Sequence, residues 1–344
     1  MTKRRLMLPV AVVAAAVAVM AVAAGVGTAG SNEASASYKL FLIPKFIGIP
    51  VFTLNGAGAK AAGKQLGDTV TYNGPTAASA TAQVTFINTA VQQGANAIII
   101  SGNDPNAVAP ALKRAMAKGV KVISYDADVA ADARDLYVSP PSAKEIGYAQ
   151  VEWLGSQIGY KGEIAILSAT PTAANQNTWI KFMKAALKKP KYKGMKLVKV
   201  AYGNDNPTDS AKETQALLQA YPNLKGIISP TTVGISSAAQ VLDQAGKCSA
   251  VALTGLGLPD QMRKYVKKGC AKKFGLWNER DFGYLATYVA SLVLDGKLDG
   301  KLGQSFDAGR LGKRTVVVSD GNKPVVVLGD PLVFTPQNID NYHF

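Results

Sequence analysis

The sequence predicts an α/β fold made of two similar Rossmann-like halves, each with a parallel sheet. The stretch from Lys39 to Gly67 indicates a buried strand, a loop and a helix, which is the opening unit of such a sheet. Short apolar strands then alternate with helices along the chain. The segments that begin at Ala97 and at Gly226 also share one order of strand, polar loop, helix, glycine and strand, so the halves resemble two copies of one fold.

The first half supplies four strands and three helices. Ser79 and Asp104 are suitable helix caps, Pro105 suits a first helical position, and Gly94 and Gly119 suit helix ends. The predicted strands are 40–43, 70–72, 97–100 and 121–124, and the predicted helices are 56–67, 79–93 and 105–119.

The second half repeats this scheme and ends in a tail without helical periodicity. The predicted strands are 164–168, 197–201, 226–229, 251–254 and 273–277, with helices ending at Lys188, Ala220 and Ala245 and another over 282–294. In the glycine- and valine-rich tail, 315–319 and 325–328 are strand-like. A length of 344 residues is enough for two domains.

The first 36 residues have the pattern of a signal peptide. A basic start (Lys3, Arg4, Arg5) precedes an apolar run from Leu6 to Val26, and Ala34-Ser35-Ala36 is a suitable cleavage site. An uncleaved membrane anchor is the alternative, and the paired arginines also leave twin-arginine export open. We expect the mature protein to be exported, to the periplasm or another extracytoplasmic location.

The basic balance does not predict a nucleic-acid partner. The formal charge of +15 falls to +13 without the first 36 residues, and the lysines are spread over helices and turns. A solvated basic surface on an exported monomer explains this distribution.

The two cysteines predict a structural disulfide. Cys248 and Cys270 each precede a predicted strand, and parallel neighbours that start level bring such positions within bridging distance. No CxxC spacing is present, and two cysteines with one histidine do not suit a zinc site. We therefore expect neither a metal nor another cofactor.

Polar side chains repeatedly follow a predicted strand, where parallel sheets bind small molecules. They are Lys45, Asn103, Asp126 and Asp128 in the first half and Asn175, Gln176, Thr231, Thr232 and Asn278 in the second. Turn and cap roles are the competing interpretation, strongest for Asn103 and Asp128 and weakest for Lys45, since lysine is no cap at a strand end.

Together these groups suit a polyhydroxyl ligand rather than catalysis. Carboxylates and amides pair with hydroxyls, and Phe52, Trp277 and Phe46 could stack on a sugar ring, although aromatic residues at strand ends are often core. The only histidine is His343, next to the terminus, and no nucleophile elbow, dinucleotide loop or phosphate loop is present. The sequence predicts a binding protein and not an enzyme.

From about Leu40 to Gly283 the chain resembles the type I periplasmic sugar-binding proteins of bacterial ABC importers. The similarity is greatest to the rhamnose-binding proteins and the related autoinducer-2-binding proteins. It is carried by the segments IPKFIGIPVF, NGPTAASATAQVTFIN, PALKRAMAKGVKVISYDADV, NQNTW, YPNLKGIISPTTVGISSAAQ, GLGLPDQM and LWNERDFGY.

The resemblance implies ligand contacts at Lys45, Asp126, Asn175 with Gln176, and Pro230 with Thr232. Two of these positions differ from the autoinducer-2 binders, which have an aspartate where this chain has Asn175 and an alanine where it has Thr232. Loss of a carboxylate removes a strong hydroxyl acceptor. A rhamnose-like deoxyhexose is therefore favoured over autoinducer-2.

The resemblance also implies two lobes joined by three crossovers near Ser139, Glu279 and Gly309. The first lobe would hold 37–139 and 279–308, and the second 140–278 and 309–344. Hinge closure would bury the sugar, and a membrane permease would recognise the closed form. A sensor that presents its ligand to a chemoreceptor or a receptor kinase is the rival function.

Overall fold

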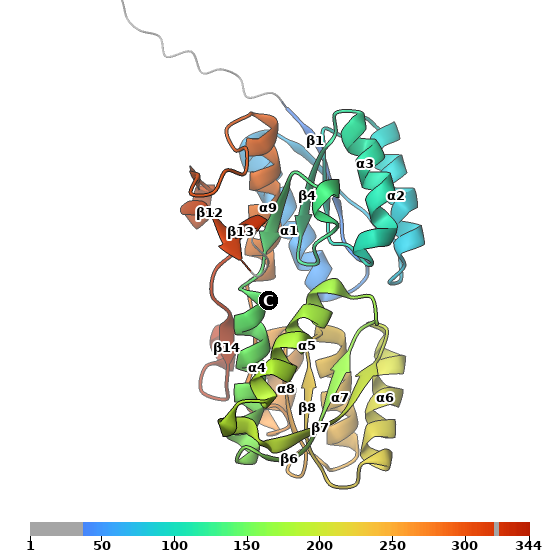
Figure 1. Cartoon of the computed structure of the whole chain (residues 1–344), viewed down its shortest axis with the longest axis vertical. Coiled ribbons are helices and arrows are strands. Elements are labelled where there is room, and N and C mark those ends of the chain that lie inside the picture. The colour runs from blue at the N-terminus through green and yellow to red at the C-terminus, as the bar shows by residue number, and fades with distance from the viewer. Residues whose placement is uncertain (1–36, 320–322) are drawn as a thin grey trace, which may run out of the picture. The chain divides into compact units, whose positions relative to one another are not determined.

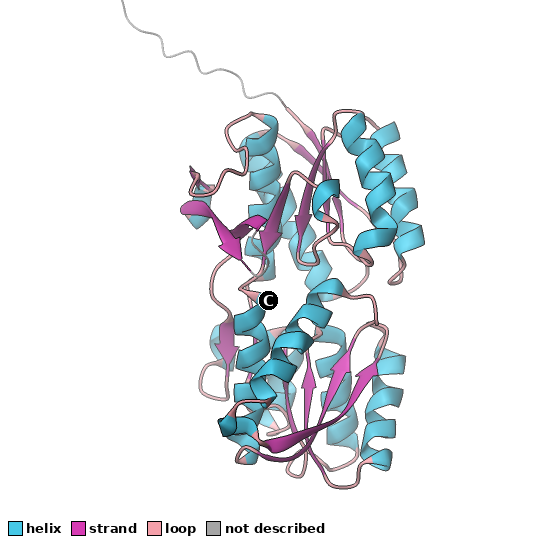
Figure 2. Cartoon of the chain, in the orientation of Figure 1, coloured by secondary structure: helices cyan, strands magenta, loops and turns pink. Residues whose placement is uncertain are grey.

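Two parallel sheets contain most of the strands in the computed structural model, which describes residues 37–319 and 323–344 (Figures 1 and 2). The predicted signal peptide lies outside these residues. Within the described part of the chain, no helix combines the length and the apolar character needed to cross a membrane.

The first sheet has the strand order β11-β12-β13-β5-β4-β3-β1-β2, and neighbouring strands from β13 to β2 are parallel. Its strands are β1 (Lys39–Ile43), β2 (Thr69–Tyr72), β3 (Ala97–Ile100), β4 (Lys121–Tyr125), β5 (Leu136–Ser139), β11 (Ser305–Asp307), β12 (Lys313–Ser319) and β13 (Lys323–Val327). The four predicted strands are confirmed to within one residue at each end. Strand β5 was not predicted, because four residues including a half-buried tyrosine give little pattern.

Helices cover both faces of this sheet. Alternate residues of β1 point to opposite faces: Leu40 and Leu42 join the core under α1 and α9, whereas Phe41 and Ile43 join the core under α2 and α3 (Figure 1). The helices are α1 (Pro50–Leu66), α2 (Ala80–Gln92), α3 (Pro105–Ala117) and α9 (Glu279–Leu294).

The second sheet repeats the arrangement with the parallel order β7-β6-β8-β9. Its elements are β6 (Lys161–Ser168), β7 (Gly194–Tyr202), β8 (Leu224–Ser229), β9 (Ala252–Gly255), α4 (Ala143–Ile158), α5 (Ala174–Leu187), α6 (Pro207–Ala220), α7 (Thr232–Gln244) and α8 (Pro259–Lys267). A separate antiparallel pair joins β10 (Phe274–Leu276) to β14 (Leu332–Phe334). Short 3₁₀ helices span Ala131–Ala133, Pro190–Tyr192, Gly309–Leu311 and Ile339–Asn341.

Helix caps fix the strand-to-loop boundaries next to the sheet ends. The side chain of Asp104 accepts hydrogen bonds from the backbone nitrogens of Asn106 and Ala107, as its predicted cap role requires. The expected start of α1 at Gly56 is wrong. The helix begins at Pro50, which occupies a first-turn position, so Phe52 lies on a helix and not in a loop.

Helices α1 and α9 touch through their backbones. A Cβ atom on Gly58 would lie 1.8 Å from the carbonyl oxygen of Arg280, and one on Gly283 would lie 1.9 Å from that of Asn55. Both distances are far below van der Waals contact, so only glycine fits at these two positions. The first turns of α1 and α9 are thereby held against each other.

We expect Gly283→Ala to lower the free energy of unfolding by at least about 3 kcal/mol, because the new methyl group meets backbone that cannot rotate away. Gly56→Ala, on the same helix pair, is the matched comparison, since the three atoms nearest to its Cβ would all belong to the Tyr72 side chain and not to backbone. Urea unfolding followed by circular dichroism would measure both. An equal loss in the two variants would contradict a rigid backbone contact.

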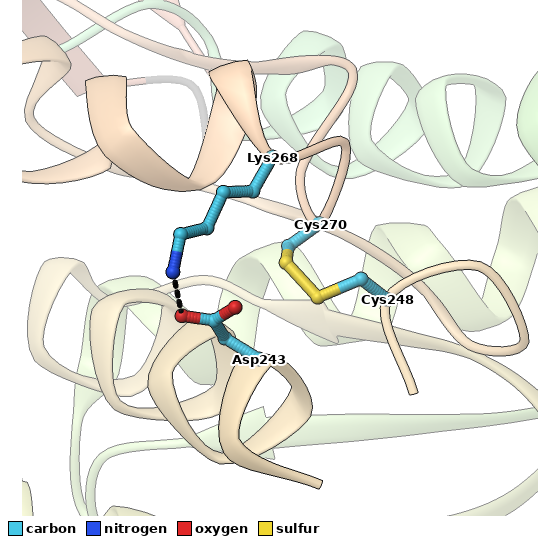
Figure 3. Close-up of a disulfide and its surroundings, with 4 residues drawn as sticks. All are labelled: Asp243, Cys248, Lys268 and Cys270. Carbon is cyan, nitrogen blue, oxygen red and sulfur yellow. Dashed lines mark hydrogen bonds and ion pairs between the residues drawn. A yellow bond between two sulfur atoms is a disulfide. The ribbon is translucent and has the colours of Figure 1, made fainter. Parts of the chain in front are cut away.

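The predicted disulfide between Cys248 and Cys270 is confirmed (Figure 3). It joins the segments that lead into β9 and β10, whose ends are linked by a parallel bridge between Leu256 and Gly275. Beside it, Lys268 Nζ lies 2.6 Å from Asp243 Oδ2. Asp243 and the two sulfur atoms are close enough to hold a metal, but the disulfide occupies both sulfurs and the carboxylate is paired with Lys268.

Replacing both cysteines by alanine should lower the free energy of unfolding by about 3 kcal/mol, since the bond closes a loop between positions 22 apart. Chemical denaturation of the wild type with and without dithiothreitol provides the control. The reductant should bring the wild type to the stability of the double variant and leave the variant unchanged. Equal stability of oxidised wild type and variant would refute a stabilising role.

Candidate functional site

Loops and helix starts that follow strands of both sheets surround one cavity of about 50 Å³. It lies where the strands end, as the sheet rule predicts. Its lining comprises Lys45, Ile49, Val51, Phe52, Asn55, Asp126, Asn175, Gln176, Trp179, Asp205, Pro230, Thr231, Thr232, Leu256, Leu276, Trp277 and Glu279.

Lys45 follows β1 and is only 4% exposed. Its Nζ donates a hydrogen bond of 3.2 Å to Asn175 Oδ1 and lies 3.9 Å from Asp126 Oδ2. Its backbone carbonyl accepts a bond from Asn103 Nδ2 at 2.7 Å. The buried Gln83 in turn binds Pro44 O, Ser101 O and the backbone nitrogen of Asn103. These bonds fix the loop that carries the lysine.

Asp126 follows β4 in the left-handed backbone region, with φ at 56°. Such a conformation costs free energy, although aspartate tolerates it better than most residues. The Tyr137 hydroxyl donates to the Asp126 carbonyl at 2.8 Å, and Ser101 Oγ donates to Oδ2 at 2.7 Å. The carboxylate is therefore held in one orientation.

Asn175 links the two sets of loops. Its Nδ2 donates to Asp126 Oδ1 at 3.0 Å, while its Oδ1 accepts from Lys45 and from the backbone nitrogen of Gln176. Gln176 is itself buried, and its Oε1 accepts from Ser168 Oγ and from the Ala169 nitrogen. The start of α5 thus presents amide groups to the residues of the first sheet.

A second part of the lining, called the apolar wall below, consists of apolar and aromatic side chains. The Trp179 and Trp277 rings lie edge to face with centroids 6.1 Å apart, and Phe52 packs in the same way on Phe46 at 5.5 Å. Ile49, Val51, Leu256 and Leu276 complete this wall. The cavity combines a polar side with an apolar one, which suits an amphipathic small molecule such as a sugar.

Nine of the residues predicted from the sequence meet at this cavity: Lys45, Phe52, Asp126, Asn175, Gln176, Pro230, Thr231, Thr232 and Trp277. Three others lie outside its lining. Asn103 supports the Lys45 backbone, Asp128 accepts from Ser124 and forms an ion pair with Arg134, and Asn278 caps α9. Asp128 lines a neighbouring cavity of about 200 Å³ that shares Asn175 and Trp179 with the first.

A family model supplies the identity of this arrangement. The model of the periplasmic binding protein domain matches residues 40–298. The chain belongs to the periplasmic binding protein family. Members of this family bind substrates for transporters and are not enzymes, as the sequence predicted, and the family implies an extracytoplasmic location.

Three solved structures resemble this periplasmic binding protein over nearly the whole chain. A sugar ABC transporter protein from Actinomyces odontolyticus is 44% identical, with a TM-score of 0.71 and coverage of 90% of this chain and 100% of that one. A solute-binding protein from Clostridium phytofermentas with bound L-rhamnose is 34% identical (TM-score 0.87, coverage 90% and 98%). LsrB from Clostridium saccharobutylicum in complex with AI-2 is 28% identical (TM-score 0.83, coverage 89% and 100%).

These similarities confirm the type I fold and a sugar-binding protein of the ABC importer class. Within that class, the sequence missed four polar or aromatic lining residues of this periplasmic binding protein: Asn55, Trp179, Asp205 and Glu279. Trp179 stands in the recognised segment NQNTW, which could have indicated it. Glu279 likewise stands in the recognised segment LWNERDFGY, and Asp205 lies in the turn three residues after β7. Asn55 lies inside α1 and gave no comparable signal.

Burial raises the pKa values of the two acidic residues among these four, Asp205 and Glu279. It raises the pKa of Asp205, with a further rise from Asp126, while Lys45 and a hydrogen bond from Thr231 oppose the change. Burial also raises the pKa of Glu279 well above its usual value, and the charge of Asp126 adds to this rise. The Asn55 amide and the Trp277 indole oppose it. The carboxyls of Asp205 and Glu279 therefore favour the neutral form more than free carboxyls do.

Glu279→Gln should make the protein relatively more stable as the pH rises. A raised pKa in the folded state means that the proton on Glu279 stabilises the fold, and this contribution is lost as the pH climbs from about 4.5 towards the raised value. Glutamine does not titrate. The stability difference between variant and wild type should therefore grow with pH, at up to about 1.4 kcal/mol per unit.

Denaturant midpoints measured from about pH 5 to pH 8 would show this growth. The range covers roughly three pH units and begins above the usual carboxyl pKa. Glu145→Gln, at an exposed position in α4, is the matched control and should run parallel to the wild type. A constant stability difference between Glu279→Gln and the wild type across the range would show that folding does not change the pKa of Glu279.

Proposed function

We propose that this chain is the extracytoplasmic solute-binding protein of an ABC sugar importer, and that it binds a rhamnose-like 6-deoxyhexose in the cavity described above. The observation that carries the proposal is the meeting of Lys45, Asp126 and Asn175 from loops far apart in the sequence. Their donors and acceptors now pair with one another, and sugar hydroxyls offer the same bonds.

The apolar wall supports a deoxyhexose in particular. Phe52, Trp179 and Trp277 can cover a sugar face, and Ile49, Val51, Leu256 and Leu276 offer a site for a methyl group. A hexose with a hydroxyl at that carbon would bury the hydroxyl among groups with no hydrogen-bond partner. The methyl group of a deoxyhexose avoids this cost.

Autoinducer-2 is the second candidate ligand, because LsrB, solved with AI-2, resembles this chain. Two observations favour the deoxyhexose. The L-rhamnose-bound structure is more similar in both sequence and TM-score. Asn175 also donates to Asp126, whereas an aspartate at that position would set two carboxylates about 3.0 Å apart. The amide therefore belongs to a different hydrogen-bond arrangement from the one that the autoinducer-2 binders use.

We further propose that a membrane permease of an ABC transporter accepts the sugar, that the chain acts as a monomer without a nucleic-acid partner, and that the first 36 residues are its signal peptide. Hinge closure between two lobes would bury the ligand. The lobes would divide near Ser139 and Glu279, as the sequence suggests. The third crossover would fall at 328–331 and not near Gly309, because β12 and β13 belong to the first sheet whereas β14 pairs with β10.

A sensor that presents the same sugar to a chemoreceptor or a receptor kinase remains the alternative. The cavity would serve both functions equally, since each needs a closed, sugar-bound form. Uptake of labelled sugar by cells with and without this protein separates the two, because only the importer requires it for accumulation.

Calorimetric titration of the mature protein should show binding of L-rhamnose, with D-ribose and autoinducer-2 weaker. Asp126→Asn should weaken rhamnose binding by roughly tenfold or more, because a charged acceptor of the cavity is lost. Asp104→Asn is the matched control. Residue 104 lies outside the cavity lining, and asparagine caps a helix as well as aspartate does.

Preference for autoinducer-2 over rhamnose would refute the deoxyhexose and keep the cavity. Binding of rhamnose that is equally strong in Asp126→Asn would place the sugar elsewhere. Absence of heat from all three ligands would contradict the proposed ligand class.

A further inference from the structure

The turn between β7 and α6 brings a carboxylate to the cavity. Asp205 lies in this turn, is half-buried and belongs to the cavity lining. The position that follows β6 offers only an amide, that of Asn175. In the described part of the chain, Asp205 is thus the one lining carboxylate that comes from a loop of the second sheet.

The backbone of this turn holds a conformation that side chains disfavour. Asp205 and its neighbour Asn204 have φ angles of 48° and 56°, so two consecutive residues other than glycine stand in the left-handed region. Such residues cost free energy and persist where surrounding bonds impose them. Here the backbone nitrogens of Gly203 and Asn204 donate to the carbonyls of Ser168 and Ala169, both at 2.8 Å. The end of β6 therefore holds the turn in the shape that places Asp205 at the cavity.

Thr231 orients the Asp205 carboxylate. Its Oγ1 donates a hydrogen bond to Asp205 Oδ1. Thr231 occupies the N-cap position of α7, where a threonine hydroxyl usually accepts from a helix nitrogen, yet its side chain makes no cap hydrogen bond. The hydroxyl serves the carboxylate instead of the helix. A strained turn and a diverted cap thus both act on the same side chain.

The second carboxylate oxygen is open to a ligand. Among the described residues, Asp205 Oδ2 has no hydrogen-bond partner, and it is not one of the unpartnered polar atoms that lack accessible surface. Burial is the main cause of the raised pKa of Asp205, and the charges of Lys45 and Asp126 act on it as well. Asp205 therefore lies in the same electrostatic environment as the two charged groups from the first sheet.

We propose that Asp205 is a specificity-determining residue, whose Oδ2 accepts a hydrogen bond from a ligand hydroxyl on the side of the second sheet. The ligand class is a neutral polyol that carries a hydroxyl there. This inference rests on the proposed function, because it needs a sugar in the cavity. It adds an acceptor to the contacts expected at Lys45, Asp126 and Asn175.

The chemistry of the acceptor sets what it selects. An ionised carboxylate can only accept, so Asp205 distinguishes a hydroxyl from groups that cannot donate. An ether, a carbonyl or a hydrogen at the same carbon would leave the partly desolvated oxygen without a donor, which costs more than one lost contact. An acidic sugar would bring a further negative charge beside Asp126 and Asp205, which both line the cavity.

A titration cycle that combines ligand and protein changes is the first test. Wild-type protein and Asp205→Asn would be titrated calorimetrically with L-rhamnose and with each of its monodeoxy analogues. Asparagine keeps the size of aspartate and tolerates the left-handed backbone. The wild type should bind at least one analogue roughly tenfold more weakly than rhamnose. On Asp205→Asn the penalty for one such analogue should fall below about threefold, while the penalties for the others stay.

A matched pair of glycine variants separates recognition from folding. Asp205→Gly and Asn204→Gly each relieve one left-handed residue, because glycine adopts this conformation readily, so both should fold as judged by circular dichroism. Asp205→Gly should weaken rhamnose binding by roughly tenfold or more. Asn204 is exposed and outside the cavity lining, so Asn204→Gly should stay within about threefold of the wild type.

Unchanged rhamnose affinity in Asp205→Gly would overturn the inference. The same pattern of analogue penalties in Asp205→Asn as in the wild type would also overturn it and leave Asp205 a purely structural role in the turn. Equal weakening by both glycine variants would point to the shape of the turn and not to the carboxylate. These outcomes differ from a failure of the proposed function, in which the wild type itself binds no sugar.

Discussion

The close contact between α1 and α9 is the constraint on which the site depends. At Gly58 and at Gly283, the backbone of the partner helix occupies the space that a side-chain methyl group would need. Asn55 stands one turn before Gly58, and Glu279 stands one turn before Gly283, so the same contact brings their side chains together. Helix α1 continues the loop that carries Lys45, and α9 continues the loop that carries Trp277. Packing between two helices therefore helps to position Asn55 and Glu279, and the loops that carry Lys45 and Trp277, at the cavity.

The charge balance of the cavity explains which ligands it can hold. Among the described residues its lining includes the carboxyls of Asp126, Asp205 and Glu279, and Lys45 as a cation. Burial pushes Asp205 and Glu279 towards their neutral forms, while Lys45 lies beside Asp126. The net charge left for a ligand is small. A neutral polyol meets this condition, whereas an anionic or cationic ligand would enter a low-dielectric cavity with no opposite charge to spare.

Local rules were sufficient to predict the strand ends, and therefore most of the cavity. Lys45 and Asp126 could be found because each follows an apolar strand within two residues, and the carboxyl ends of parallel strands share one edge. Asn175, in the first turn of α5, stands in the recognised segment NQNTW. Asn55, Asp205 and Glu279 were not found, although Asp205 and Glu279 stand three residues after β7 and β10. Asn55 lies inside a helix whose start was placed too late. Glu279 matters through its contact with a residue 224 positions away, and no local pattern encodes that distance.

The same limit explains why the sequence did not predict the strand pairing of the tail or the helix α4. The strand-like segments of the tail were recognised, but the pairing of β13 with β5 and of β12 with β13 depends on contacts that periodicity does not show. Helix α4 has its apolar residues buried between the second sheet and α5, so it lacks a contrast between faces. Its mixed surface resembles neither an exposed amphipathic helix nor a strand.

Asn175 shows how ligand recognition and the joining of the two sheets become one process. Its amide bonds to Lys45 and Asp126 are among the polar links between the loops of the first sheet and the start of α5. A ligand whose hydroxyls replace these bonds keeps the two sides connected through itself. A ligand that breaks them without replacement leaves a buried lysine and a buried carboxylate with fewer partners, which costs more than the lost contacts alone. Because the penalty falls on the protein as well as on the ligand, a single amide can distinguish sugars that differ by one hydroxyl.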